Sequence, residues 1–210
     1  MYQLYYSSGA CSMAAHVVLN SVDAAFTLHK VDLAAGQQKA PDFLKLNSRG
    51  QVPVLVDDGF TLREGAAILV YLCEKHQSAW LPREGQARAA ALEWLMFGNA
   101  TLHPAYSRVF ALARHNIDQT AKNALFEIYI DGINALWQDV EARLERAAFL
   151  AGDDMTIGDI LLAVIANWGA TFPKPVVIGP RTKQLLKKVI ALPPYQKALA
   201  VEQVAYQAAA

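Results

Sequence analysis

The stretch Tyr2-Gln3-Leu4-Tyr5-Tyr6-Ser7-Ser8-Gly9-Ala10-Cys11-Ser12 decides the fold, because a strand pattern and a helix pattern meet within it. Its aromatic first half predicts a strand over residues 2–6, which the Ser-Ser-Gly turn ends. An alanine-rich helical pattern follows, so Cys11 is expected at the N-terminal end of a helix. Unpaired N–H groups and the helix dipole favour negative charge there. We therefore expect the Cys11 thiol to ionise easily, although free cysteines are also common in protein cores.

The first 76 residues alternate between strand and helix patterns. Strands are expected at residues 2–6, 26–32, 52–56 and 60–62, and helices at 12–21, 41–46 and 64–76. A strand, a helix and a strand in succession favour a parallel pair joined by a crossover helix. Asp57-Asp58-Gly59 predicts a hairpin between the last two strands. The simplest fold is a four-stranded mixed sheet with three helices.

The rest of the chain is helical after a break at residues 79–86, where proline and glycine interrupt the periodicity. Long helices are expected over 87–114, which Pro104 should bend, and over 120–148. The predicted fold class is therefore α/β plus all-α. Its parts are an α/β domain at residues 1–78, a linker at 79–86 and an all-helical domain at 87–210.

The composition restricts the classes of function. Of the 210 residues, 54% are hydrophobic and 18% are charged, which is typical of a globular protein. A net charge of zero gives no electrostatic basis for binding nucleic acid or an anionic membrane, and apolar runs of about eight residues are too short to span a bilayer. The two cysteines form no disulfide framework, and the N-terminus lacks signal-peptide features, so we expect a cytoplasmic protein. The histidines show no metal-ligand spacing, so we expect no metal.

Four short segments carry a family resemblance when they are taken together. They are Gly9-Ala10-Cys11-Ser12, Gly50-Gln51-Val52-Pro53, Arg63-Glu64-Gly65-Ala66-Ala67-Ile68 and Thr156-Ile157-Gly158-Asp159. In this order and in these structural settings, the chain resembles the cytosolic glutathione transferase family. The first segment resembles the cysteine-bearing bacterial branch, the beta class. The resemblance covers essentially the whole chain and implies a thioredoxin-like N-terminal domain followed by an all-helical domain.

The resemblance implies a glutathione site on the first domain. The loop Gln51, Val52 and Pro53 would contain a cis proline and expose the Val52 backbone to the cysteinyl part of glutathione, although the residues alone also allow an ordinary trans proline. The N–H of Gly65, at a helix start, would bind the γ-glutamyl carboxylate, and Glu64 the neighbouring ammonium group. An acid in a first helical turn also stabilises the helix dipole without any ligand.

Catalytic and acceptor-binding residues follow from the same resemblance. Cys11 would stabilise the glutathione thiolate or form a mixed disulfide with glutathione, because Cys11-Ser12-Met13-Ala14 lacks a second thiol. His103 would face the cysteine, where an imidazole can hydrogen-bond a thiolate or move a proton. Tyr106 and Trp168 would line an apolar pocket between the domains. The alternative for the histidine and the aromatic residues is a structural role.

The sequence patterns around Asp159 and Cys73 indicate structural roles for these two residues. Thr156 and Asp159 form the pattern of a capping box, with Met155 and Ile160 as a hydrophobic staple, so we expect Asp159 to stabilise the fold. Cys73 lies on the core face of its predicted helix and is read as a packing residue.

Three positions depart from the family pattern and remove polar or charged groups from the expected glutathione site. Gly36 stands near the position where bacterial relatives often place a lysine, with Lys39 a few residues later. Met96 stands where an amide would reach the neighbouring subunit, and Pro104 stands where a lysine is frequent. Each lost charged hydrogen bond would cost about 1.5–3 kcal/mol of glutathione affinity, which Arg49 would offset in part.

The leading hypothesis is a homodimeric, cytoplasmic glutathione transferase. It would add glutathione, its co-substrate, to small hydrophobic electrophiles, with Cys11 and His103 at the reacting sulfur. Reduction of glutathione mixed disulfides through Cys11 is the competing chemistry. The alternative from another class is a non-catalytic module on the same fold that binds apolar ligands or a protein with weak glutathione affinity, since fold alone does not imply function.

Overall fold

The structure is a computed structural model and describes residues 1–210. Its chain forms two compact units. The first contains Met1–Arg88 and Ile190–Ala205, and the second contains Ala89–Val189 and Tyr206–Ala210. The segment Ile190–Ala205, which the sequence analysis assigned to the helical domain, therefore belongs to the first unit.

The first unit is built on a four-stranded mixed sheet, as predicted. Its strands are β1 (Tyr2–Tyr6), β2 (Phe26–Lys30), β3 (Val54–Asp57) and β4 (Phe60–Arg63). They lie in the order β2-β1-β3-β4, with β1 and β2 parallel and the other two pairs antiparallel. Asp58 and Gly59 connect β3 to β4 with φ of 46° and 88°, because a two-residue hairpin turn that matches the strand twist needs positive φ at both positions.

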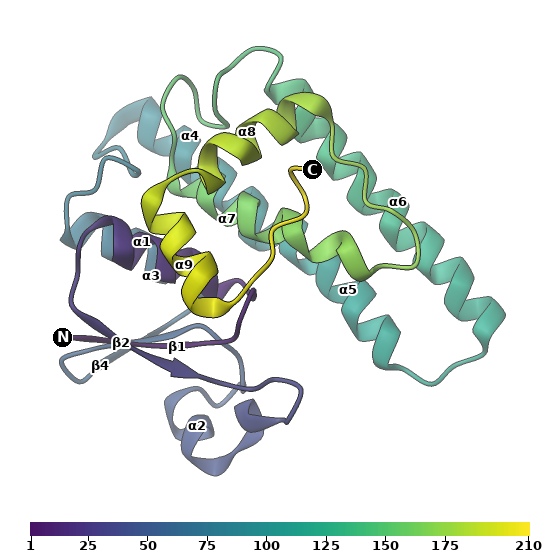
Figure 1. Cartoon of the computed structure of the whole chain (residues 1–210), viewed down its shortest axis with the longest axis horizontal. Helices are drawn as coiled ribbons and strands as arrows, with labels where there is room; N and C mark the ends of the chain where they lie inside the picture. The colour runs from purple at the N-terminus through teal and green to yellow at the C-terminus, as the bar shows by residue number, and fades with distance from the viewer. The chain divides into compact units, whose positions relative to one another are not determined.

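Helices cover both faces of this sheet (Figure 1). They are α1 (Ser12–Ser21), α2 (Pro41–Leu46) and α3 (Gly65–Lys75), and α9 (Pro193–Glu202) packs against α1. Alternate residues of β1 (Tyr2, Leu4 and Tyr6) are buried on the face covered by α1 and α3. On the opposite face, Phe43 of α2 packs with Val54 and Tyr5. The period-two burial thus assigns each side chain of the strand to one of two cores.

The second unit is entirely helical. Its helices are α4 (Gly85–Met96), α5 (His103–Arg114), α6 (Gln119–Arg143), α7 (Ile157–Ala166) and α8 (Pro180–Ile190). The unit boundaries fall within α4, which belongs to the second unit from Ala89 onward, and at the end of α8, which belongs to it as far as Val189. α5 and α6 lie side by side, and every residue of α7 is buried, which makes it the central helix of the unit. α6 ends at Arg143, short of the predicted end at residue 148.

The predicted helix at 87–114 is divided into three segments. α4 ends at Met96, a π-helical segment spans Phe97–Leu102, and α5 begins at His103. Pro104 explains the wider turn, because its nitrogen has no hydrogen to donate and its ring would clash with the carbonyl four residues earlier. In place of the expected bend at Pro104, the structure has a π-helical segment that ends at Leu102.

The capping box at the start of α7 is confirmed. Asp159 is fully buried, and its carboxylate accepts hydrogen bonds from the backbone N–H groups of Thr156 (2.8 Å) and Leu150 (3.0 Å) and from the Thr156 hydroxyl (3.1 Å). These donors belong to the start of α7 and to the segment that precedes it, which supports the folding role expected for Asp159.

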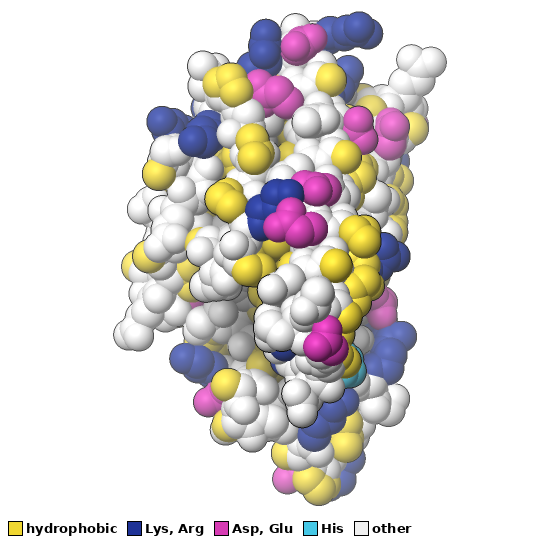
Figure 2. Space-filling model, turned by 90° about the vertical axis from the view of Figure 1, so that its right-hand side faces the viewer, with side chains coloured by type: hydrophobic (Ala, Val, Ile, Leu, Met, Phe, Trp, Pro, Cys, Tyr) yellow, Lys and Arg dark blue, Asp and Glu magenta, His cyan; other side chains and the backbone are white.

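The surface carries no broad area of one charge on the face shown in Figure 2, where basic and acidic side chains are interspersed. This agrees with the net charge of zero. No helix combines the length and the apolar character needed to cross a membrane.

Candidate functional site

Cys11 lies at the N-terminal end of α1, as predicted. Its helical backbone conformation (φ −56°, ψ −22°) leads directly into Ser12. The sulfur lies 3.7 Å from the carbonyl oxygen of Val52, to which the thiol donates. Ser12 ties the preceding loop together, because its hydroxyl donates to the Ser7 carbonyl and accepts from the Ser7 N–H, both at 3.2 Å. The loop therefore fixes the direction of the thiol toward Val52.

The expected easy ionisation of Cys11 is wrong in this structure. Burial raises the pKa of the Cys11 thiol to about 11. The N–H groups of Cys11 and Ser12 lower this pKa, as the helix-start argument anticipated, but the loss of water around the sulfur has the larger effect. The nearby negative charge of Glu64 raises the pKa further. Cys11 is consequently a protonated S–H group at neutral pH.

The loop of Gln51, Val52 and Pro53 contains the expected cis peptide bond between Val52 and Pro53. The side-chain amide of Asn47 donates to the Gln51 carbonyl at 2.7 Å and holds the loop from behind. Gly50 precedes it with φ of 63°, and a Cβ at this position would lie 2.7 Å from the Gln38 carbonyl oxygen. A glycine is required here by both conformation and space.

Glu64 and Gly65 form the start of α3, as predicted. Glu64 adopts φ of 70° and ψ of 115°, an unusual backbone conformation for a non-glycine residue, which costs about 1–3 kcal/mol and is found preferentially at functional sites. Its side chain caps no N–H group of the helix. Instead its carboxylate, 57% exposed, pairs with the Arg49 guanidinium at 2.7 Å. Val52 accepts a hydrogen bond from the Cys11 thiol, and the charge of Glu64 raises the pKa of that thiol. These predicted residues of the first unit therefore lie near Cys11.

Lys39, for which no role was predicted, lies beside the same loop. Its amine contacts the Arg49 carbonyl at 3.5 Å, and it would be 3.0 Å from a Cβ at Gly50. Gly36, at the position where relatives often carry a lysine, has φ of 75°, and a Cβ added there would meet nothing within 4 Å. The short helical turn Gln37–Lys39 thus brings a cation to the loop from a position three residues later.

His103 lies in the second unit within a group of aromatic residues. Its ring centroid is 4.9 Å from that of Trp168, with an edge-to-face interplanar angle of 65°. Burial lowers the pKa of His103, so the imidazole is neutral at pH 7. Trp168 is partly exposed and also contacts Phe110. The structure therefore brings His103 and Trp168 into contact, and the catalytic role of His103 and the pocket role of Trp168 stay predictions.

Tyr106 is a core residue, and its predicted place in an open pocket is not supported. Its side chain is fully buried between Trp168 and Phe172. Its hydroxyl accepts a hydrogen bond of 2.9 Å from the Trp137 indole. The reason is the register of α5, which turns Tyr106 toward α6 while His103 and Phe110 remain partly exposed.

Glu202 of α9 holds the cysteine loop, residues 7–11, and this role is not predicted from the sequence. Its carboxylate, fully buried, accepts from the Gly9 N–H at 2.9 Å and contacts the Nδ1 of His16 at 2.9 Å. It thereby fastens α9 to both ends of the Cys11 segment. No local pattern announces this role, because Gly9 and Glu202 are separated by almost the whole chain. An isolated acid at the end of an apolar helix was the only available signal.

No three side chains of His, Cys, Asp or Glu gather into a group that could hold a metal ion. The residues of the site are thiol, backbone amide, carboxylate and imidazole groups, which suit the binding and activation of a polar thiol ligand.

A thioredoxin-like domain with a thiol at a helix start, joined to a helical domain, defines a class of thiol-handling proteins, and known sequences identify the family. The family model described as glutathione S-transferase, N-terminal domain matches residues 2–74, and that described as glutathione S-transferase, C-terminal domain matches residues 100–193. Glutathione S-transferase GST-4.5 of Xanthomonas campestris is 36% identical over 168 residues, which cover 79% of this chain and 81% of that protein.

Two further comparisons agree. Glutathione S-transferase 3 of Zea mays is 36% identical over 192 residues, covering 87% of this chain and 86% of that protein. The solved structure of a glutathione S-transferase from Xylella fastidiosa has a TM-score of 0.87 at 27% identity, covering 98% of this chain and 100% of that one. The chain therefore belongs to the glutathione S-transferase family. Its place in the beta class stays a prediction.

Proposed function

We propose that the protein is a glutathione transferase that adds the glutathione thiolate to small hydrophobic electrophiles, with Cys11 acting as a hydrogen-bond donor. The observation that carries this proposal is the position of the Cys11 thiol, at the start of α1 and donating to the backbone carbonyl of Val52. A bound glutathione whose cysteinyl part pairs with Val52 would place its sulfur near this donor. An S–H group donating to a thiolate favours the ionised, nucleophilic form of glutathione.

In this reaction one sulfur–carbon bond forms and one bond to the leaving group breaks. The glutathione thiol loses its proton, its sulfur attacks an electrophilic carbon, and with an aromatic halide the halide ion leaves with the electron pair of the broken bond. We propose that neutral His103 assists by taking the proton of the glutathione thiol, since burial keeps its imidazole free to accept one at pH 7. Trp168 would contact the apolar body of the electrophile.

We assign the two ends of glutathione to groups beside Cys11. The backbone N–H of Gly65, at an α3 terminus that Glu64 leaves uncapped, suits the γ-glutamyl carboxylate, and Glu64 the ammonium group. Lys39, whose amine lies beside the Arg49 carbonyl and Gly50, suits the glycyl carboxylate. Lys39→Gln should therefore raise the KM for glutathione about three- to tenfold and leave kcat unchanged, because the lost contact is present in both the ground and transition states.

Disulfide reduction through Cys11 is the competing function, and the protonated thiol argues against it. Attack on a mixed disulfide requires Cys11 as a thiolate, which its raised pKa makes scarce at neutral pH. The two free cysteines fit a reducing cytoplasm, where we place the protein.

Cys11→Ser and Cys11→Ala distinguish the two chemistries. If Cys11 is a donor, the serine variant keeps a hydroxyl that can donate, so transfer to an aromatic halide should fall about tenfold or more in Cys11→Ala and far less in Cys11→Ser. If Cys11 is the nucleophile, both variants should lose disulfide reduction equally. Transfer that is unchanged in Cys11→Ala would overturn the site.

A non-catalytic binding module is the second candidate, because Glu64 is already paired with Arg49 and must exchange that partner to bind glutathione. Retention on immobilised glutathione without turnover of any aromatic halide would support it. A mass increase of about 305 Da would reveal a glutathione adduct on Cys11, which belongs to the mixed-disulfide chemistry instead.

A further inference from the structure

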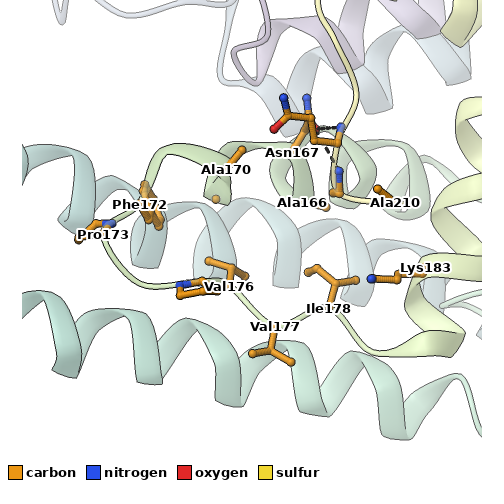
Figure 3. A pocket seen from close by; sticks show the side chains of 14 residues that line it. Ala166, Asn167, Ala170, Phe172, Pro173, Val176, Val177, Ile178, Lys183 and Ala210 are labelled. Carbon is orange, nitrogen blue, oxygen red and sulfur yellow. Dashed lines mark hydrogen bonds between the residues drawn. The ribbon is translucent and has the colours of Figure 1, made fainter.

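A cavity of about 580 Å³ lies wholly within the second unit (Figure 3). It is bounded by the end of α7, the segment Phe172–Gly179 that leads to α8, and the last residues of the chain. Its volume is within the range of small-molecule sites. Neither His103 nor Trp168 lines it, so it is separate from the acceptor pocket proposed above.

One wall of the cavity is the segment Phe172–Gly179, which is fixed to α6 along its length. The Lys174 amine pairs with Glu127 at 2.6 Å and with Asp131 at 2.7 Å, and the Val177 N–H donates to the Asn134 side chain at 2.8 Å. Just beyond the segment, the Glu141 carboxylate accepts from the N–H groups of Arg181 and Thr182, both at 2.9 Å. These contacts hold the wall in place without a ligand.

The opposite wall, the chain end Tyr206–Ala210, is fixed in the same way. The Tyr206 hydroxyl donates to the Ala163 carbonyl at 2.8 Å. The side-chain oxygen of Asn167 accepts from the N–H groups of Gln207 at 2.7 Å and Ala208 at 3.3 Å. With both walls held, the space between them is preformed, and a ligand need not order either wall to enter it.

The lining combines an apolar surface with a single charged side chain. Phe172, Val176 and Ile178 supply apolar surface, and Lys183 of α8 is the only charged side chain among the lining residues. Lys183 is partly buried, and its amine forms no hydrogen bond or ion pair. Figure 3 shows this amine directed toward Ile178. The Lys174 amine of the same wall is held by two carboxylates, so Lys183 is the cation that remains available to a ligand.

We propose that this cavity binds a small organic anion, a carboxylate or sulfonate with a compact apolar body. The Lys183 amine pairs with the anionic group, and Phe172, Val176 and Ile178 contact the apolar body. A partly buried amine beside apolar surface selects such an anion over its neutral analogue, because a charge-assisted hydrogen bond in a place with little water is stronger than one in bulk solvent.

The test is calorimetric titration of the full chain with 1-naphthoate and with its neutral analogue 1-naphthamide. Saturating S-hexylglutathione is present, so that the proposed transferase site is occupied. We expect 1-naphthoate to bind about tenfold more tightly than 1-naphthamide. Lys183→Gln should abolish this preference and Lys183→Arg should keep it. Lys187→Gln, which removes an exposed charge from the same helix, is the matched control and should change nothing.

A second measurement locates the ligand. In amide NMR spectra, 1-naphthoate should shift the signals of Gly169, Val176 and Ala208, which line the cavity. Ala170→Phe, which fills the cavity from an exposed position, should weaken the binding of both probes. Equal 1-naphthoate affinity in the wild type and Lys183→Gln, shifts confined to other amides, or no saturable binding would overturn the proposal. None of these readouts depends on glutathione transfer, so the proposed function stands or falls separately.

Discussion

At the scale of single residues, Cys11 shows that position at a helix start does not by itself produce a thiolate. The N–H groups at the end of α1 favour the anion, but burial of the sulfur and the charge of Glu64 oppose it and prevail. A group with a raised pKa in the folded state contributes stability that is present below its unfolded pKa and is lost as the pH rises through the folded value. For Cys11 this window runs from its ordinary pKa near 9.0 to about 11.

We therefore predict that Cys11 ionises only in strongly alkaline solution. In a Cys73→Ser variant, which leaves one thiol, the thiolate absorbance near 240 nm should rise with a midpoint about pH 11, and alkylation should be slow at pH 7. The Cys11→Ser variant is the control, because Cys73 is also buried and its pKa is likewise raised to about 11. A midpoint below pH 8 in the first variant would contradict the S–H donor role.

Glu202 is the residue whose removal should cost most in the first unit. Glu202→Ala leaves His16 and the Gly9 N–H without their partner in a place where both side chains of the pair are at most 1% exposed. Breaking a buried pair of this kind lowers the free energy of unfolding by about 3 kcal/mol or more. Urea denaturation measures the loss.

Glu145 provides the matched control for Glu202. It pairs with Arg181 at 3.6 Å, but about half of each side chain is exposed, so Glu145→Ala should change the stability by less than about 1 kcal/mol. Similar losses in the two variants would mean that the buried contact between α9 and the cysteine loop stabilises the fold no more than an exposed ion pair does.

At the scale of elements, α7 depends on its capping box. Asp159→Ala removes the acceptor of two buried backbone N–H groups, those of Leu150 and Thr156, and each unpaired buried donor costs about 1–3 kcal/mol. We predict a loss of about 2–4 kcal/mol in the free energy of unfolding, with unchanged glutathione affinity in the molecules that fold. Thermal melting and a binding titration check the two parts.

The cap of α6 offers a comparison at the same scale. Asp118 accepts from the Ala121 N–H at 2.9 Å in an exposed position, where water replaces a lost side chain. Asp118→Ala should therefore cost only about 0.5–1 kcal/mol. A selective loss of glutathione affinity in Asp159→Ala, with normal melting, would instead give Asp159 a role in the site.

The elements were predictable where their causes are local. The period-two pattern of β1, the Asp58-Gly59 hairpin and the capping box of Asp159 each follow from neighbours in the sequence, and the structure contains all three. The sequence predicted that the helix bends near Pro104, but it did not predict a π-helical segment. Either a bend or a π-helical segment can accommodate a proline that has no N–H to donate.

At the scale of the whole molecule, the unpredicted features depend on contacts between distant parts of the chain. Glu202 reaches Gly9 across the sequence, and Tyr106 is buried against Trp137 of another helix. The pKa of Cys11 depends on how much water its surroundings exclude, which no local pattern encodes. Val52 and Glu64 do lie near Cys11, but their proximity was predicted from the family resemblance and not from sequence periodicity.

The assembly is the last property of the whole molecule that can be tested. The family resemblance implies a homodimer, and Phe60, at the start of the edge strand β4, is an aromatic side chain that is 55% exposed. Exposed aromatic residues are enriched at protein interfaces, so we predict that Phe60 lies in the contact between subunits. Light scattering should give twice the 23.0 kDa mass of one chain.

Phe60→Ser should weaken this dimer about tenfold or more, because an aromatic anchor is lost, while the stability of the subunit changes little at so exposed a position. The matched control is Ile128→Ser on α6, which removes an exposed side chain of 64% accessibility from another element. Dilution experiments that follow the mass from dimer to single chain separate the two variants. Dissociation caused by Ile128→Ser and not by Phe60→Ser would place the interface on α6, and a single-chain mass for the unaltered protein would remove the dimer altogether.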